Sequence, residues 1–249
     1  VGPGSGYLAC GDVDTGRMSE PEDIVEAICE VLNPAPQDLA GKRIVITAGP
    51  THEPIDPVRF IGNRSSGKMG IALAGEAARR GDAGTLVLGP TSLDVPRSVE
   101  CVRVQTAAEM LEAALNAFQT ADVAICAAAV ADYTPASPAD HKLKKANERL
   151  DHIELVETVD ILAELSRQKG ERRVIGFAAE TDNVVEYAAR KLARKDCDAI
   201  IANDVSRADS GFGTDTNKAW IVSTMGTQEL PVLTKSQLAD IILDLLHNI

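Results

Sequence analysis

Aromatic residues and long apolar runs are both scarce in this sequence. Phe, Trp and Tyr make up 3% of its 249 residues. No apolar run approaches the roughly 20 residues that a membrane-spanning helix needs. Residues 1–6 are rich in glycine and unlike the apolar segment of a signal peptide. These absences predict a soluble, cytoplasmic protein without a membrane partner.

Basic residues and paired cysteines are lacking as well. The 25 Lys and Arg residues are outnumbered by 37 Asp and Glu residues, which gives a net charge of −12. Such a chain is a poor partner for nucleic acid, because nucleic-acid binding needs a basic surface. The five cysteines are odd in number, widely spaced and without a CxxC pair, which argues against a disulfide framework and a zinc site. A reducing cytosol suits this composition.

Strand-like and helix-like segments alternate along most of the chain. Several of the strand-like segments are continuous apolar runs, as expected of parallel strands covered on both faces. The predicted strands are 43–47, 85–88, 122–127, 174–177, 199–202 and 219–223. The predicted helices are 21–32, 67–80, 106–118, 159–169, 183–195 and 234–247. This alternation predicts an α/β fold with a Rossmann-like, doubly wound and mostly parallel sheet, helices on both faces, and ligands at the carboxyl ends of the strands.

A proline-rich stretch indicates a domain boundary. Pro34 and Pro36 follow the first predicted helix and end it. We therefore expect a short N-terminal piece at 1–33, a linker at 34–40 and a main domain at 41–249.

Two glycine-bearing loops lie at the expected ligand-binding edge. Gly49 follows the first strand of the main domain and lets backbone N–H groups approach a phosphate. Residues 62–70 contain the GxxxxGK pattern, but Met69 stands where a P-loop has the Ser or Thr that binds magnesium, so we reject a Walker A motif. Ser65 or Ser66 is expected to cap the next helix, whose free N–H groups could bind an anion. The plain alternative is a capped helix after a long surface loop.

A run of small residues and a cluster of lysines come next. Residues 127–133 end the third strand with alanines and one carboxylate, Asp132. A long loop then leads to Lys142-Leu143-Lys144-Lys145, three lysines on an acidic protein. We interpret this loop as a mobile flap that brings positive charge onto a polyphosphate. A solvated basic patch is the alternative.

Later strands also end in candidate binding residues. Phe177 is either a base-stacking face or part of the core. Lys191 and Lys195 are neighbours on one helical face, and Asn203 ends the following strand.

Together these segments resemble the phosphopantothenoylcysteine synthetase domain of coenzyme A biosynthesis, in the same order and over residues 41–249. The matching pieces are Thr47-Ala48-Gly49, Asp56-Pro57-Val58-Arg59-Phe60-Ile61, Asn63, Ser65-Ser66-Gly67-Lys68-Met69-Gly70, Ala127–Tyr133, Lys142-Leu143-Lys144-Lys145, Gly176–Thr181 and Ala202-Asn203-Asp204-Val205-Ser206. The sequence departs from the family in two places. Glu157-Thr158-Val159-Asp160 replaces a Lys-Thr-Pro-Asp-like turn, and Pro50 replaces the usual second glycine.

The N-terminal piece resembles the tail of the flavin-dependent phosphopantothenoylcysteine decarboxylase, which precedes the synthetase in bifunctional bacterial proteins. The matching pieces are Ala9-Cys10-Gly11-Asp12, Gly16-Arg17-Met18 and Glu20-Pro21. The resemblance implies that Cys10 is the acid of that decarboxylase. FMN would serve only the flavin-binding body, which this sequence lacks, so this chain alone is not expected to decarboxylate.

The main resemblance implies a ligase that uses CTP and Mg²⁺. The carboxylate of 4′-phosphopantothenate would attack CTP, expel pyrophosphate and form an acyl-cytidylate, and the amine of L-cysteine would then displace CMP. Such catalysis depends on positioning and charge stabilisation and needs no Ser-His-Asp set. The magnesium ion would be coordinated by the phosphates rather than by a dedicated set of protein ligands. The family also implies a homodimer, joined to the flavin domain in the full-length protein.

The resemblance carries roles to individual residues. As catalytic residues it implies Asn63, which would hold the reacting carboxylate, Arg59 beside it, and Lys142, which would reach the triphosphate. For the acid substrate it implies Asn63, Arg59, Ala128 and Ala129. For the nucleotide it implies Gly49, Ser65, Gly67, Gly70, Ala127, Ala128, Asp132, Lys142, Val156, Glu157, Thr158, Val159, Phe177, Lys191, Lys195 and Asn203.

Three alternatives stay open at this point. A nicotinamide-dependent oxidoreductase would share the doubly wound pattern, although the GxGxxG fingerprint is missing and the second strand ends at Gly89-Pro90 rather than at an acidic residue. A non-catalytic module would bind the nucleotide without releasing pyrophosphate. Within the ligase interpretation, ATP could replace CTP, because no base-reading residue is identified.

Overall fold

The computed structural model describes residues 2–7, 10–19, 21–32, 34–144 and 151–247. Of the residues quoted in the sequence predictions, Ala9, Glu20, Asn33 and Lys145 lie outside these ranges. The chain separates into two compact units, Val1–Asp38 and Leu39–Ile249. The first unit contains an antiparallel hairpin, β1 (Gly4–Tyr7) and β2 (Val13–Arg17), followed by helix α1 (Pro21–Leu32). Its assignment to a decarboxylase remnant stays a prediction.

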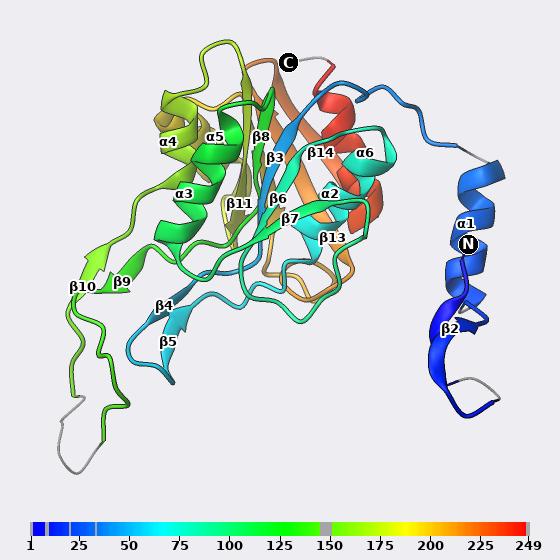
Figure 1. Cartoon of the computed structure of the whole chain (residues 1–249). Coiled ribbons are helices and arrows are strands. Elements are labelled where there is room, and N and C mark those ends of the chain that lie inside the picture. Colours follow the sequence, from blue (N-terminus) through cyan, green and yellow to red (C-terminus); the bar gives the residue numbers. More distant parts are fainter. Residues whose placement is uncertain (1, 8–9, 20, 33, 145–150, 248–249) are drawn as a thin grey trace. The chain divides into compact units, whose positions relative to one another are not determined.

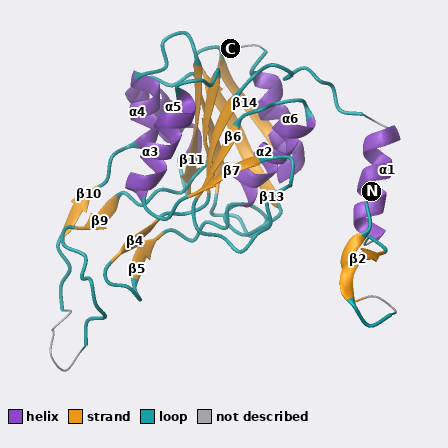
Figure 2. Cartoon of the chain, in the orientation of Figure 1, coloured by secondary structure: helices purple, strands orange, loops and turns teal. Residues whose placement is uncertain are grey.

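The second unit is built around one eight-stranded sheet (Figures 1 and 2). Its strands run in the order β14-β13-β12-β11-β8-β3-β6-β7. These strands are β3 (Ile44–Ala48), β6 (Thr85–Leu88), β7 (Glu100–Arg103), β8 (Val123–Cys126), β11 (Arg173–Glu180), β12 (Ala199–Asp204), β13 (Thr216–Ser223) and β14 (Gly226–Thr234). All neighbours from β12 to β7 pair in parallel, whereas β13 and β14 are antiparallel. The prediction of a doubly wound, mostly parallel sheet is therefore confirmed.

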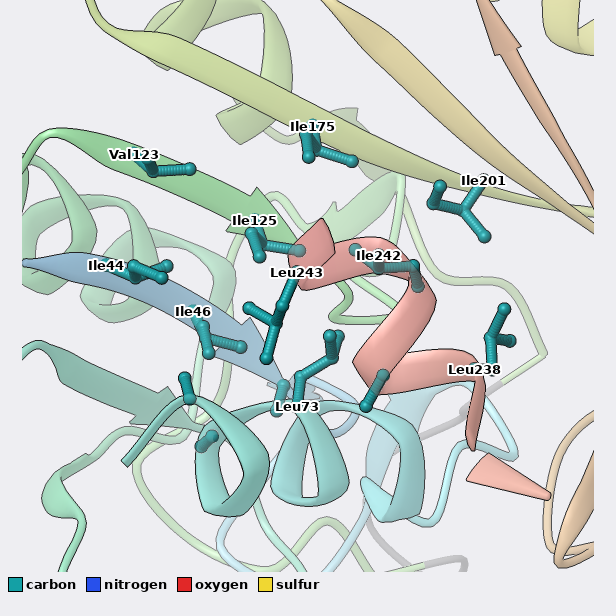
Figure 3. Close-up of a cluster of buried hydrophobic side chains, with 14 of the residues drawn as sticks. Ile44, Ile46, Leu73, Val123, Ile125, Ile175, Ile201, Leu238, Ile242 and Leu243 are labelled. Carbon is teal, nitrogen blue, oxygen red and sulfur yellow. The ribbon is translucent and has the colours of Figure 1, made fainter. Parts of the chain in front are cut away.

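Five helices cover the two faces of the sheet. They are α2 (Lys68–Arg79), α3 (Ala107–Phe118), α4 (Ile161–Arg167), α5 (Val184–Lys195) and α6 (Lys235–Leu245). Helices α2 and α6 pack on one face, where Leu73 and Leu243 meet Ile46 and Ile125 of the central strands (Figure 3). Helices α3, α4 and α5 pack on the other face around Leu165. The continuous apolar runs form strands here because each face of the sheet buries its alternate side chains under helices.

The hairpin of the first unit was not predicted, and neither were two sheet strands and two small hairpins among the described residues of the second unit. The edge strands β7 and β14 are mostly exposed and carry no continuous apolar run. The hairpins are β4 (His52–Pro54) with β5 (Phe60–Gly62) and β9 (Tyr133–Pro135) with β10 (Leu155–Glu157). Such short or exposed strands are specified by pairing with a partner strand, which the periodicity of their own residues does not reveal. Both hairpins extend from the end of the sheet where β3 and β8 finish (Figure 1).

The start of α2 differs from its prediction. Its N-cap is Gly67, in the left-handed region with φ 83°, so no side chain stands at the N-cap position, although the Ser66 hydroxyl accepts a long hydrogen bond from Lys68 N at 3.5 Å. The Ser65 hydroxyl instead accepts a hydrogen bond from Gly67 N, at 3.3 Å. A serine cap was expected because serine favours that position, but the chain turns into this helix through a glycine with positive φ, which a side chain rarely adopts.

Candidate functional site

A cavity of about 770 Å³ lies at the carboxyl ends of the parallel strands. Its lining includes Thr47, Cys126, Phe177 and Asn203, which belong to β3, β8, β11 and β12. The first residues of α2, Lys68, Met69 and Gly70, also line it. The volume suits a small-molecule ligand, and the place is where α/β sheets bind ligands.

A second, smaller cavity does not fit the predicted chemistry. It measures about 240 Å³ and lies at the amino ends of β3, β6 and β7, beside Ile44, Thr85 and Glu100. Its charged lining residues are both acidic, Asp82 and Glu100. We therefore place the candidate site in the larger cavity.

Most of the predicted site residues line that larger cavity. They are Asn63, Ser65, Gly67, Gly70, Ala127, Ala128, Ala129, Asp132, Glu157, Thr158, Val159, Phe177, Lys191, Lys195 and Asn203. Gly49, Arg59, Lys142 and Val156 are not part of its lining, and Cys10 lies in the first unit. Asn63 and Asp132 thus share one cavity, whereas Lys142 is an exposed residue of the loop between β9 and β10.

Asn63 is held by the loop that follows β8. Its side-chain nitrogen donates to the carbonyl oxygens of Ala129 and Val130, at 3.1 and 3.0 Å. The same loop is tied to the end of β3, because Ala129 N donates to Gly49 O at 2.9 Å. These bonds fix the amide group at the rim of the cavity and employ both of its N–H groups, so its oxygen is the atom available to a ligand.

The start of α2 approaches β3 closely, because Gly70 has no side chain. A Cβ added at Gly70 would lie 2.2 Å from the Ala48 Cβ. This packing places the first turn of α2 against the end of β3 and beside the cavity. The unpaired N–H groups and the positive dipole end of such a helix favour an anion.

An ion pair and a half-buried lysine form the opposite wall. Asp160 caps α4 by accepting from Ala163 N at 2.8 Å, and it also forms an ion pair with Lys195. Burial by itself would raise the pKa of Asp160, but the hydrogen bond from Lys195 and the capping bond outweigh it and lower that pKa. Lys191 donates to Phe177 O at 2.7 Å, and burial lowers its pKa. Two ammonium groups thus enter the cavity from α5.

Arg59 has a different position from the one expected. Its guanidinium forms an ion pair with Asp56 and donates to Leu143 O at 3.0 Å. Asp56 is buried and accepts from Val58 N and Arg59 N, both at 2.8 Å, and from Leu143 N at 3.2 Å. These bonds, with that from Arg59 foremost, hold the pKa of Asp56 well below its usual range. Arg59 therefore anchors the lysine-bearing loop to the loop between β4 and β5.

Gly49 lies where two loops approach each other closely. Its φ is 79°, and a Cβ there would lie 3.1 Å from Gly89 O. The glycine allows the loops after β3 and β6 to meet, and its phosphate-binding role stays a prediction.

Several lining residues were missed as site residues, among them two lysines, a phenylalanine and an asparagine. These four are Lys68, Phe212, Asn217 and Lys235. The signal that could have identified Lys68 and Lys235 is a lysine at the first position of a helix, where the dipole disfavours a cation. Asn217 and Phe212 carry no comparable signal, because only the folding of β13 against β12 brings them to this edge.

Two features are absent from the described part of the chain. No helix within it combines the length and the apolar character that crossing a membrane requires. The same residues contain no cluster of three or more His, Cys, Asp or Glu side chains that could bind a metal ion.

Comparisons with known proteins agree with this geometry. The family described as "DNA/pantothenate metabolism flavoprotein C-terminal domain" matches residues 39–249. The coenzyme A biosynthesis bifunctional protein CoaBC of Bacillus subtilis is 48% identical over 238 residues, which are 94% of this chain and 58% of that protein. The chain therefore spans less than two thirds of the length of this relative.

Solved structures share the fold. A crystal structure of the C-terminal domain of CoaBC has a TM-score of 0.71 and 46% identity, covering 83% of this chain and 94% of that one. A Cab2 mutant in complex with phosphopantothenate-cysteine has a TM-score of 0.66 at 15% identity, covering 91% of this chain and 92% of that one. At that identity the second likeness concerns the fold alone.

Proposed function

The chain belongs to the DNA/pantothenate metabolism flavoprotein C-terminal domain family, and from this premise we propose that it is a phosphopantothenate–cysteine ligase of coenzyme A biosynthesis. The substrates are 4′-phosphopantothenate, L-cysteine and CTP with Mg²⁺. CTP as the nucleotide, the homodimer and the role of the N-terminal piece as a decarboxylase remnant belong to the same proposal.

The single observation that carries the proposal is the composition of the 770 Å³ cavity. One wall offers the first turn of α2 and its glycines, which suit phosphate groups. The rim offers the Asn63 amide, and the opposite wall offers Phe177 with Lys191 and Lys195. A nucleoside triphosphate and a carboxylic acid are the pair of ligands that would use these groups together.

The chemistry follows from that arrangement. A carboxylate is a poor electrophile, and its attack on the α-phosphate of CTP turns it into a mixed anhydride whose leaving group is CMP. The lysines and the start of α2 stabilise the charge on the phosphates, and Mg²⁺ bound to CTP neutralises part of it. The Asn63 side chain orients the reacting acyl group. The cysteine amine then attacks the acyl carbon, forms the amide and releases CMP.

The experiment is pyrophosphate release from the purified chain with CTP, Mg²⁺ and 4′-phosphopantothenate. We expect release only when the acid is present, and steady formation of CMP and phosphopantothenoylcysteine after L-cysteine is added. Omission of the acid is the matched control. CTP binding without pyrophosphate release would contradict the proposal and favour a non-catalytic module.

A further inference from the structure

Two lysines stand where the fold makes a positive charge unfavourable. Lys68 is the first residue of α2 and Lys235 is the first residue of α6. The positive end of a helix dipole repels a cation. Helices α2 and α6 pack against each other on one face of the sheet, and both lysines line the candidate cavity.

The loop after β12 and the start of β13 hold both ammonium groups. The Lys68 ammonium donates to Asp215 Oδ1 at 2.6 Å, and the Lys235 ammonium donates to Asn217 Oδ1. Each also donates to a backbone carbonyl oxygen of residues 211–213, at 3.0 Å for Lys68 and 3.4 Å for Lys235. The loop after β12 and the start of β13 therefore keep the two side chains side by side at the cavity wall.

Of the two ammonium groups, that of Lys235 costs the folded protein more free energy. It is 7% exposed, and among the described residues it has no ion-pair partner, because Asp215 is paired with Lys68. Burial, and then the nearby charge of Lys68, lower the pKa of Lys235 to about 8, and the Asp215 carboxylate offsets only part of this effect. A buried cation with neutral partners at a positive helix end is destabilising unless an anion reaches it.

The position of this pair indicates which anion it would meet. Lys68 and Lys235 adjoin the first turn of α2, where the phosphates of the nucleotide are proposed to bind. Lys191 and Lys195 reach the cavity from α5, on the other face of the sheet. The α2 side of the cavity therefore carries two ammonium groups in addition to its backbone N–H groups. This concentration of positive charge suits the β- and γ-phosphates, which form the most highly charged end of a triphosphate.

We propose that Lys235, with Lys68 beside it, binds the β- and γ-phosphates of the nucleoside triphosphate and holds the pyrophosphate that leaves. This inference rests on the proposed ligase function and adds a binding residue to it. When the carboxylate oxygen bonds to the α-phosphorus, the bond from that phosphorus to the bridging oxygen breaks, and its electron pair stays on pyrophosphate. The ammonium groups remain protonated and stabilise that charge.

The test compares Lys235→Met with Lys218→Met in the full chain. Lys218 is also a largely buried lysine, paired with Glu229 at 2.6 Å, but it does not line the cavity. Isothermal titration at pH 7 would measure binding of CTP, CMP and inorganic pyrophosphate, each with Mg²⁺. For Lys235→Met we expect CTP and pyrophosphate to bind about 10- to 100-fold more weakly, since hydrogen bonds to charged groups have effects of that size, and CMP to bind within about twofold of wild type. Lys218→Met should leave all three affinities unchanged.

The outcomes separate this inference from the proposed function. If the wild type makes phosphopantothenoylcysteine while Lys235→Met binds CTP and pyrophosphate normally, the inference is wrong and the ligase proposal stands. An equal loss of CMP, CTP and pyrophosphate affinity would also overturn it, because that pattern indicates general damage to the cavity. Partial recovery of pyrophosphate affinity in Lys235→Arg, which keeps the charge, would support it. A wild type that neither binds CTP nor releases pyrophosphate would instead refute the proposed function.

Discussion

The two glycines of α2 offer a matched test of how the phosphate-binding end of the cavity is built. Both Gly70 and Gly75 lie inside this helix, where replacement by alanine favours the helical state by about 1 kcal/mol. They differ in what the added methyl group meets. At Gly70 it would lie 2.2 Å from the Ala48 Cβ and 3.1 Å from the Ala48 Cα, whereas at Gly75 its nearest neighbour is Pro96 Cγ at 3.4 Å.

These distances set the expected magnitudes. Carbon atoms need about 3.5 Å, so Gly70→Ala must push α2 away from β3 by about 1 Å. Overpacking of this kind costs about 1–3 kcal/mol, and the upper end applies because the neighbour is the backbone of a central strand. After the gain in helix propensity, we expect Gly70→Ala to lower the free energy of unfolding by about 2 kcal/mol. Gly75→Ala should raise it by about 0.5–1 kcal/mol.

The assay is urea denaturation followed by tryptophan fluorescence. Trp220 is the only tryptophan of the chain and lies in β13, so it reports on the second unit alone. Gly70→Ala should also raise the KM for CTP, because it displaces the first turn of α2, while Gly75→Ala should leave that KM unchanged. If Gly70→Ala were as stable as Gly75→Ala, the close packing of α2 on β3 would not exist as described.

Other predictions concern the lysine-bearing loop, the site and the thiols. The Asp56 carboxylate has a lowered pKa in the folded protein, so its contribution to stability is present above about pH 4 and is lost as the pH falls below that value. Asp56→Asn should remove this acid dependence and speed amide exchange in the 139–144 loop at pH 7, and unchanged exchange would contradict the anchoring role. Asn63→Asp should retain CTP affinity but lower kcat about 100-fold, because a carboxylate cannot donate to the loop after β8. Lys142→Gln should slow pyrophosphate release in the first half-reaction, and wild-type rates in both variants would refute the site assignment. Burial raises the pKa of the Cys197 thiol to about 11, so about one molecule in 1,000 is a thiolate at pH 8. Mass spectrometry after iodoacetamide treatment should find the exposed Cys10 labelled and Cys197 unlabelled until the protein unfolds.

The central strands and all of the helices could be predicted from local sequence. The strands predicted at 43–47 and 199–202 form β3 and β12, and the helix predicted at 106–118 forms α3, because each pattern matches the period of the element it builds. In the structure, Thr106 and Glu109 form a capping box at the start of α3. The edge strands β7 and β14 could not be found in this way, since their stability comes from pairing with neighbours.

The sequence by itself determined the fold class and the family, because both depend on local patterns and on an ordered set of motifs. It also placed Asn63, Asp132 and the start of α2 at one edge of the sheet, since the carboxyl ends of parallel strands lie together. Only the tertiary structure decided that Arg59 pairs with Asp56 and anchors the lysine-bearing loop, and that Lys235 joins the cavity wall. Those contacts join segments that are far apart along the chain, such as Arg59 with Leu143. Their geometry depends on how loops and edge strands pack together, which the neighbouring residues in the sequence do not specify.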